Sequence, residues 1–160
     1  HDEIAKIADM IRDIRVAMLT TVEPDGSLHA RPMAVTERPF DGTIVFFTKD
    51  DAPKVDEALR ERHVGVSLGD PNREKFVSLS GVASVTQDHA IMAGAWSDRL
   101  KGWFPKGLAD PDLALLVVRV TEAEYWDTPP SAIGNFLGAA KASISGTTYD
   151  PGNHGKVRLG

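Results

Sequence analysis

The sequence contains no cysteine among its 160 residues. Disulfides, thiolate metal sites and cysteine nucleophiles are therefore excluded, and this composition suits the cytosol. The formal net charge is −5 and no basic run occurs, which argues against nucleic acid or an anionic membrane as a partner. No apolar stretch approaches the roughly 20 residues of a membrane helix, and the first residues lack a secretory signal pattern. We therefore expect a cytoplasmic protein.

The common motifs of catalysis and nucleotide binding are also missing. The sequence has no G-x-G-x-x-G, no P-loop and no G-x-S-x-G. The five histidines are scattered, with no two spaced to share a helix face, so we expect no metal site. The adjacent carboxylates Asp50 and Asp51 fall in a predicted turn, where capping or solvation is the ordinary role. No catalytic residue can be named from the sequence.

The chain does contain many short runs with the alternation or β-branched content of strands. The first run is continuously apolar, so we expect it to be buried on both faces or nearly so. Gly81 interrupts the fifth run, which suggests a bulge or a barrel corner. The predicted strands cover residues 16–22, 28–35, 43–48, 63–68, 76–86 and 114–126.

Helical periodicity occurs between and outside these strands. No regular β-α-β alternation exists, so a small antiparallel barrel with helices outside it fits better than a doubly wound sheet. We expect one domain over residues 1–144 and an exposed, mobile tail over 145–160, which is rich in glycine and turn formers. The predicted helices cover residues 2–15, 53–62, 89–104 and a segment after Ser131.

The stretch from Leu28 to Lys54 suggests a phosphate site. Pro53 is typical of a first helical position, so a helix opens near Ala52 and offers free N–H groups to an anion. Arg31 and Lys54 would flank this position if the strands before and after Asp41-Gly42 pair. The alternative is that both are ordinary solvated residues. Our hypothesis is that a phosphate-bearing cofactor binds here.

Aromatic residues gather late in the chain, where all three tryptophans occur. Core packing is the alternative explanation for them, above all for Trp96. Trp103 and Phe104, just before Pro105 at a predicted helix end, favour a cleft or an interface. Tyr125 and Trp126 end the last predicted strand.

Six short motifs occur in an order and at spacings shared with one group of proteins. They are Ala30-Arg31-Pro32-Met33, Phe46-Phe47-Thr48, Ala52-Pro53-Lys54-Val55, Phe76-Val77-Ser78-Leu79-Ser80-Gly81, Lys101-Gly102-Trp103-Phe104-Pro105 and Glu124-Tyr125-Trp126-Asp127. Through these motifs the chain resembles the general stress protein branch of the pyridoxamine 5′-phosphate oxidase-like, FMN-binding split-barrel superfamily. The resemblance implies a mainly β fold with peripheral helices, built on a six-stranded antiparallel split β-barrel.

The same resemblance implies a homodimer with FMN at each of two subunit interfaces. Arg31 and Lys54 would bind the phosphate, helped by Thr48 and the backbone near Ala52. The residues that would contact the rest of the flavin are Pro32, Met33 and Phe47 along the ribityl chain and ring edge, Trp126, and Trp103 with Phe104 from the facing subunit.

Two departures from the family pattern bear on the activity. Ala52 stands where relatives often have a hydroxyl. Thr36 stands where the true oxidases have a substrate-binding lysine, and their C-terminal Arg-x-His pattern is not found. We therefore expect an FMN-binding general stress protein that acts as a flavin-dependent oxidoreductase. The alternatives are a pyridoxamine 5′-phosphate oxidase proper and a non-catalytic module that binds or sequesters flavin.

Overall fold

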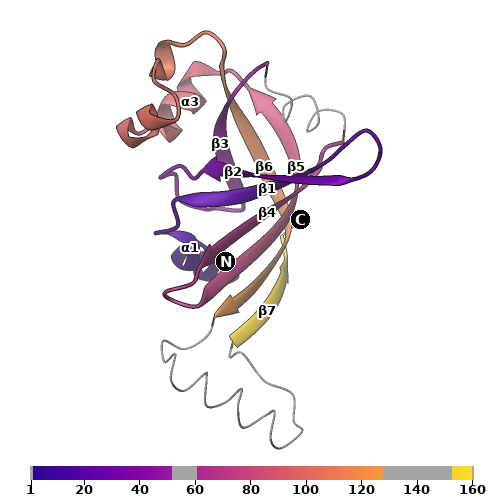
Figure 1. Cartoon of the computed structure of the whole chain (residues 1–160). Helices are drawn as coiled ribbons and strands as arrows, with labels where there is room; N and C mark the ends of the chain where they lie inside the picture. Colours follow the sequence, from indigo (N-terminus) through magenta and orange to yellow (C-terminus); the bar gives the residue numbers. More distant parts are fainter. Residues whose placement is uncertain (1, 52–60, 128–152, 160) are drawn as a thin grey trace, which may run out of the picture.

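The computed structural model describes residues 2–51, 61–127 and 153–159 (Figure 1). Its strands are β1 (Val16–Val22), β2 (Leu28–Ala34), β3 (Thr43–Lys49), β4 (His63–Asp70), β5 (Lys75–Thr86), β6 (Leu113–Asp127) and β7 (Asn153–Arg158). Its helices are α1 (Asp2–Ile11), α3 (His89–Ala95) and the 3₁₀ helices η1 (Asp98–Gly102) and η2 (Gly107–Ala109). The six predicted strands are therefore confirmed, and the described part of the chain adds β7.

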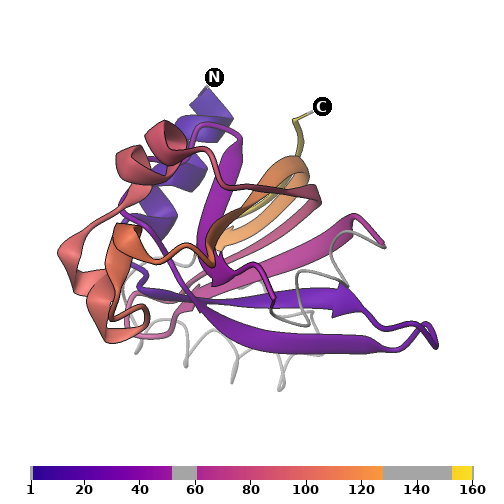
Figure 2. The same ribbon diagram turned by 90° about the horizontal axis from the view of Figure 1, so that it is seen from above.

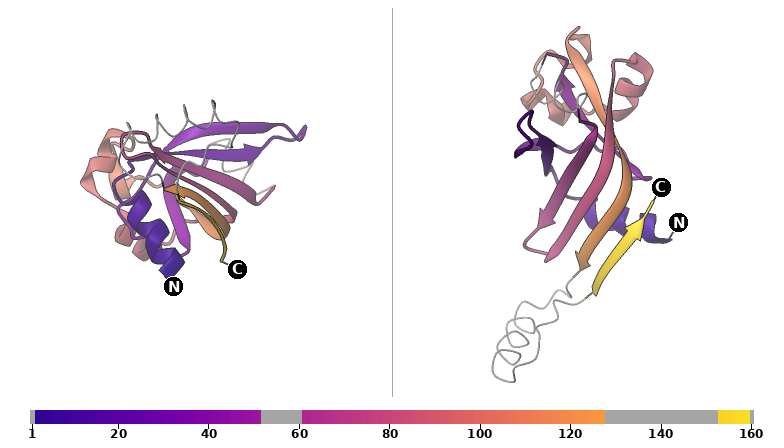
Figure 3. Two further views of the ribbon diagram at one scale, coloured as in Figure 1. Left: turned by 90° about the horizontal axis from the view of Figure 1, so that it is seen from below. Right: turned by 90° about the vertical axis from the view of Figure 1, so that its right-hand side faces the viewer.

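The strands form one antiparallel sheet in the order β2-β1-β4-β5-β6-β3, with β7 also paired to β6. The first half of β6 pairs with β3 and the second half with β7, and Figure 3 shows β7 running beside β6. β2 and β3 approach each other at the two ends of the strand order, but no ladder joins them in the described part of the chain. The barrel is therefore closed by packing at this seam, as in a split barrel, and the strand pairing assumed for the phosphate site was wrong.

Alternate strand side chains and one face of α1 fill the barrel interior, which we call the barrel cluster. The apolar stripe of α1 supplies Ile7, Met10 and Ile11, and Ile14 follows in the next turn. The predicted helix over residues 2–15 is thus correct in type but ends at Ile11. Ile14 is still buried, because its N–H bonds to the carbonyl of Ile11 at 3.0 Å and returns the chain to the core.

A second set of buried residues, the outer cluster, lies on the outside of β3 and β6. It joins Ala34, Phe47, Met92, Leu100 and Leu115. The covering elements are α3, η1 and η2, which Figure 2 shows gathered at one side of the barrel, away from the β1–β2 turn. Neighbouring residues of one strand therefore serve two cores, since Phe46 belongs to the barrel cluster and Phe47 to the outer cluster.

The helix predicted over residues 89–104 is broken in the structure. α3 ends at Ala95, Trp96 is extended with ψ 139°, and η1 begins at Asp98. The extended backbone lets the Trp96 ring pack edge-on against Phe47, with the centroids 5.3 Å apart. Helical periodicity remained in the sequence because Met92 and Leu100 are buried in the same cluster on either side of the break.

The prediction that β1 is buried on both faces or nearly so was wrong. Its side chains alternate between buried and exposed, and Met18 is 40% exposed. The outward side chains of β1, β2, β4 and β5 are not covered by the described elements. These residues, which we call the open face, are Val16, Met18, Leu28, Ala30, Pro32, Ser67 and Phe76.

Residues 153–158 form strand β7, where the sequence predicted part of a mobile tail. Val157 is buried, and a Cβ at Gly155 would lie 2.4 Å from the far end of the Tyr125 side chain, so any larger residue would have to displace that ring. Lys156 donates to Glu122 at 2.7 Å, and that hydrogen bond holds the pKa of Glu122 below its ordinary value. The sequence did not predict β7 because the strand has only one buried apolar residue, Val157, and depends on pairing with the edge of β6.

Several predicted features lie outside the described residues. They are the helix over 53–62 apart from its last two residues, the helix after Ser131, and residues 145–152 of the predicted tail. No helix among the described residues combines the length and hydropathy that crossing a membrane requires.

The predicted bulge at Gly81 is confirmed by a shift in the β5–β6 register between Ser80 and Gly81. A Cβ at Gly81 would lie 2.6 Å from the carbonyl oxygen of Arg119 and 2.7 Å from a methyl group of Val118. Gly81→Ala should therefore destabilise the fold by about 1–3 kcal/mol, the usual cost of overpacking. Gly94→Ala is the control, because nothing lies within 4 Å of that position on α3. Thermal unfolding of both variants tests this, and equal melting temperatures would contradict it.

Candidate functional site

Arg31 lies on β2, and Thr21 and His29 hold it within the described part of the chain. One terminal nitrogen, Nη1, donates to the hydroxyl of Thr21 at 2.6 Å, and Nη2 lies 2.7 Å from Nδ1 of His29. Thr21 is fully buried on the adjacent strand β1. The guanidinium is therefore oriented by the barrel rather than left to sweep through solvent.

The two residues that follow Arg31 point to different environments. Pro32 is exposed on the open face, opposite Met18, and it cannot donate to a ladder, which suits the end of the strand order. Met33 is buried in the barrel cluster. Because strand side chains alternate, the Arg31 guanidinium and the open face lie on opposite sides of β2.

Phe47 and Thr48 are both buried at the end of β3. The Phe47 ring packs against Trp96 and lies 6.3 Å from the Phe104 ring, centroid to centroid. The Thr48 hydroxyl lies 3.5 Å from the carbonyl oxygen of Lys49. Both residues therefore stiffen the strand end from which the chain enters the predicted phosphate site, while Ala52 and Lys54 lie outside the described residues.

A partly buried ion pair that the sequence did not reveal fixes the same strand end. Lys49 pairs with the carboxylate of Asp110, whose side chain is almost completely buried. The other Asp110 oxygen accepts from the N–H of Asp112 at 2.9 Å, and the carbonyl of Asp112 accepts from the N–H of Asp50 at 2.8 Å. The signal was limited to the turn formers at Asp110-Pro111-Asp112, because the partners are 61 residues apart.

Trp103 and Phe104 have different surroundings despite being neighbours. Phe104 is half-buried and joins the outer cluster. Trp103 follows η1 and is 50% exposed. The structure therefore packs the Phe104 ring against the outer cluster and leaves the Trp103 ring exposed to solvent. That this helix end faces a cleft or an interface stays a prediction.

Trp126 lies near the end of β6, beside β7. Its ring stacks on His154 with centroids 5.3 Å apart and an interplanar angle of 11°, and Nε2 of His154 lies 2.7 Å from Glu124. Thr48 pairs with Ala114, from which Trp126 is twelve residues further along β6. That is about 40 Å of strand at 3.3 Å per residue. Figure 1 shows β6 running from the region of α3 toward β7. One subunit therefore does not bring Trp126 together with Phe47 and Thr48, which lie at the other end of β6.

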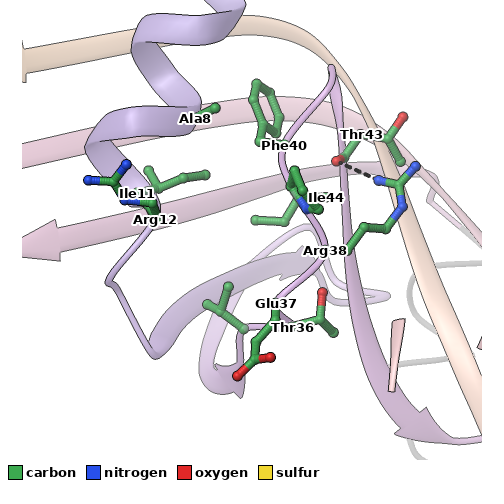
Figure 4. A pocket seen from close by; sticks show the side chains of 11 residues that line it. Ala8, Ile11, Arg12, Thr36, Glu37, Arg38, Phe40, Thr43 and Ile44 are labelled. Atoms are coloured by element: carbon green, nitrogen blue, oxygen red, sulfur yellow. Dashed lines mark hydrogen bonds between the residues drawn. The ribbon is translucent and has the colours of Figure 1, made fainter. Parts of the chain in front are cut away.

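A pocket of about 270 Å³ lies between α1 and residues 35–44 (Figure 4). Its apolar wall includes Ile11, Phe40 and Ile44. The polar ends of Arg12, Glu37 and Arg38 point away in different directions in Figure 4, and Arg38 is tied to the carbonyl of Thr43. None of the predicted cofactor residues lines this pocket. A ligand site needs polar groups that converge, so we do not place the cofactor here.

Metal ligation finds no support in the described ranges. No group of three or more histidine, aspartate or glutamate side chains there could hold an ion. The described residues offer a ligand the oriented guanidinium of Arg31 and the aromatic rings near Phe47. The buried end of β3 holds these groups in place.

Comparisons with known proteins agree on the fold. A protein from Jannaschia sp. CCS1, provisionally named general stress protein 26, is 25% identical over 99% of both chains with a TM-score of 0.74. The general stress FMN/FAD binding protein of Xanthomonas citri is 28% identical, with 83% of this chain and 94% of that chain covered and a TM-score of 0.69. Protein bli-3 of Neurospora crassa is 23% identical over 90% of this chain and 74% of its own length.

The profile of one protein family covers nearly the whole chain. Its description is "Pyridoxamine 5'-phosphate oxidase like", and it matches residues 2–150. That range spans the site residues on β2 and β3, the aromatic residues after α3 and Trp126. The chain therefore belongs to the pyridoxamine 5′-phosphate oxidase-like family.

Proposed function

We propose that this chain is a cytoplasmic, dimeric FMN-binding protein that acts as a flavin-dependent oxidoreductase. The observation that carries the proposal is the guanidinium of Arg31 on β2, which contacts Thr21 on β1 and His29 on its own strand. A planar, oriented guanidinium suits a phosphate group, which it can bind with two parallel hydrogen bonds. The name of the Xanthomonas citri relative, an FMN/FAD binding protein, supports a flavin as the molecule that carries this phosphate.

FMN is favoured over FAD and over pyridoxal phosphate. The sequence has one candidate phosphate site, at Arg31 and Lys54, and no dinucleotide fingerprint. Bound FMN would supply the electron transfer, and the protein would bind, orient and tune it. Lys49 and Asp110 would keep the end of β3 in place for the phosphate, since a buried, hydrogen-bonded carboxylate resists displacement.

The dimer is proposed because one subunit leaves the site incomplete. Trp126 is about 40 Å of strand away from the aromatic residues near η1. A second copy could bring its own Trp103 or Trp126 to the flavin. The open face supports this arrangement, because exposed apolar surface of this kind marks interaction sites, and Leu28 on it is 71% exposed.

Oxidation of pyridoxamine 5′-phosphate itself is less well supported. Thr36 is buried and carries no charge to meet a substrate phosphate. Turnover assays distinguish the three candidate functions. A pyridoxamine 5′-phosphate oxidase should release hydrogen peroxide with pyridoxine phosphate, whereas the flavin of an oxidoreductase should be reduced by NADH or NADPH. A sequestering module should bind FMN without turnover.

The phosphate assignment predicts the behaviour of two variants. Arg31→Ala should weaken FMN by about 2–4 kcal/mol, the cost of removing one partner of a desolvated charge pair. Lys54→Ala should cost less, because a flexible ammonium is a less exacting ligand. Riboflavin lacks the phosphate, so its affinity should hardly change in either variant. Titration followed by flavin fluorescence measures both ligands. Equal losses for FMN and riboflavin would instead mean that these residues support the fold.

The dimer assignment predicts that flavin binding and association are coupled. Trp103→Ala should lower FMN affinity and shift the protein toward monomer, because a ligand shared by two subunits stabilises their association by mass action. Secondary structure should be spared, since Trp103 is 50% exposed. Ile91→Ala on α3, where the side chain is 52% exposed, is the matched control. Light scattering with and without FMN tests the prediction, and a Trp103 variant that stays dimeric and binds FMN normally would refute it.

A further inference from the structure

One nitrogen of His29 lies between a donor and an acceptor. Its Nδ1 is 2.7 Å from Nη2 of Arg31 and 3.2 Å from a carboxylate oxygen of Glu23. A ring nitrogen either carries a proton and donates or has a lone pair and accepts. His29 can therefore serve Arg31 or Glu23 through this atom, but not both at once.

The neutral imidazole with its proton on Nε2 serves Arg31. Its Nδ1 accepts from Nη2, while the hydroxyl of Thr21 accepts from Nη1. The guanidinium is then gripped at both terminal nitrogens. The guanidinium carries its five N–H groups in a rigid, planar fork, so contacts at both terminal nitrogens set its plane.

The protonated imidazole serves Glu23 instead. A proton on Nδ1 leaves no lone pair there to accept from Arg31, the positive ring pairs with the Glu23 carboxylate 3.2 Å away, and its charge repels the Arg31 guanidinium beside it. The charged groups that contact His29 in the described part of the chain are Arg31 on the same strand and Glu23 in the turn between β1 and β2. Thr21, its register partner on β1, is uncharged.

We propose that His29 is a positioning residue for Arg31, and that it makes phosphate binding at this site sensitive to pH. The inference rests on the proposed function, because it takes Arg31 as the phosphate ligand. Imidazole changes charge within the physiological pH range. Neutral His29 orients the guanidinium for the phosphate, and acid releases it. The His29 side chain is 56% exposed, so the effect is modest, about threefold to fivefold in affinity.

The test is the affinity for FMN and for riboflavin at about pH 5.5 and about pH 8, on either side of the imidazole titration. The FMN phosphate titrates in the same range, so the wild type is compared with His29→Gln, whose amide can accept from Arg31 and donate to Glu23 at every pH. We expect the wild type to lose about threefold to fivefold more FMN affinity on acidification than His29→Gln does. Riboflavin affinity should change equally in both proteins.

Glu23→Gln is a second, independent variant. It removes the carboxylate that competes with Arg31 for Nδ1 of His29, so FMN affinity should fall less on acidification than it does in the wild type. Identical pH profiles in the wild type and His29→Gln, with FMN affinity still dependent on Arg31, would overturn this inference alone. Absence of FMN binding in the wild type, or FMN binding that ignores Arg31→Ala, would overturn the proposed function and this inference together.

Discussion

The bend of β6 against β5 is the constraint on which the rest of the structure depends. At Gly81 the backbone of β5 approaches the Arg119 carbonyl too closely for any side chain, and the register shifts there. β6 can then give its first half to β3 and its second half to β7. β3 and β2, at the two ends of the strand order, lie close to each other. The length of β6 separates Trp126 from the aromatic residues near η1.

Two cores follow from this arrangement of strands, and together they determine where a ligand could bind. The barrel cluster uses one side of each strand, and the outer cluster uses the other side of β3 and β6. The outer cluster stops at Ala34, so the neighbouring part of the sheet remains an open apolar face. Arg31 lies on the other side of β2, where Thr21 and His29 orient it. Charge and apolar surface are thus divided between the two sides of one strand.

Local sequence patterns predicted most of the fold because strand alternation, turn residues and one glycine act over short distances. All six predicted strands exist, and Gly81 does mark a bulge. The failures are tertiary. Trp96 leaves the helix to pack on Phe47, and β7 forms because the β6 edge is available to it. The spacing of apolar residues along the chain cannot predict either contact, since each contact joins residues far apart in the sequence.

The candidate site was predictable in its residue types but not in its geometry. The sequence pointed to Arg31 as a phosphate ligand. Its contact with Thr21 was not predictable, because that contact depends on the pairing of β1 with β2. The prediction that Phe47 lies along the flavin did not include its ring contacts with Trp96 and Phe104, which join segments far apart in the chain. The ion pair of Lys49 with Asp110 left no local signal, because it spans 61 residues.

The central claim is that the flavin is shared by two copies of this chain. Native mass spectrometry of the purified protein with added FMN tests this claim most directly, because it reports subunit number and bound ligand in the same ion. The account predicts a dimer that carries one FMN per subunit, and dissociation of the dimer should release the flavin. A monomer that retains FMN after dissociation, or a dimer that takes up no FMN, would contradict it.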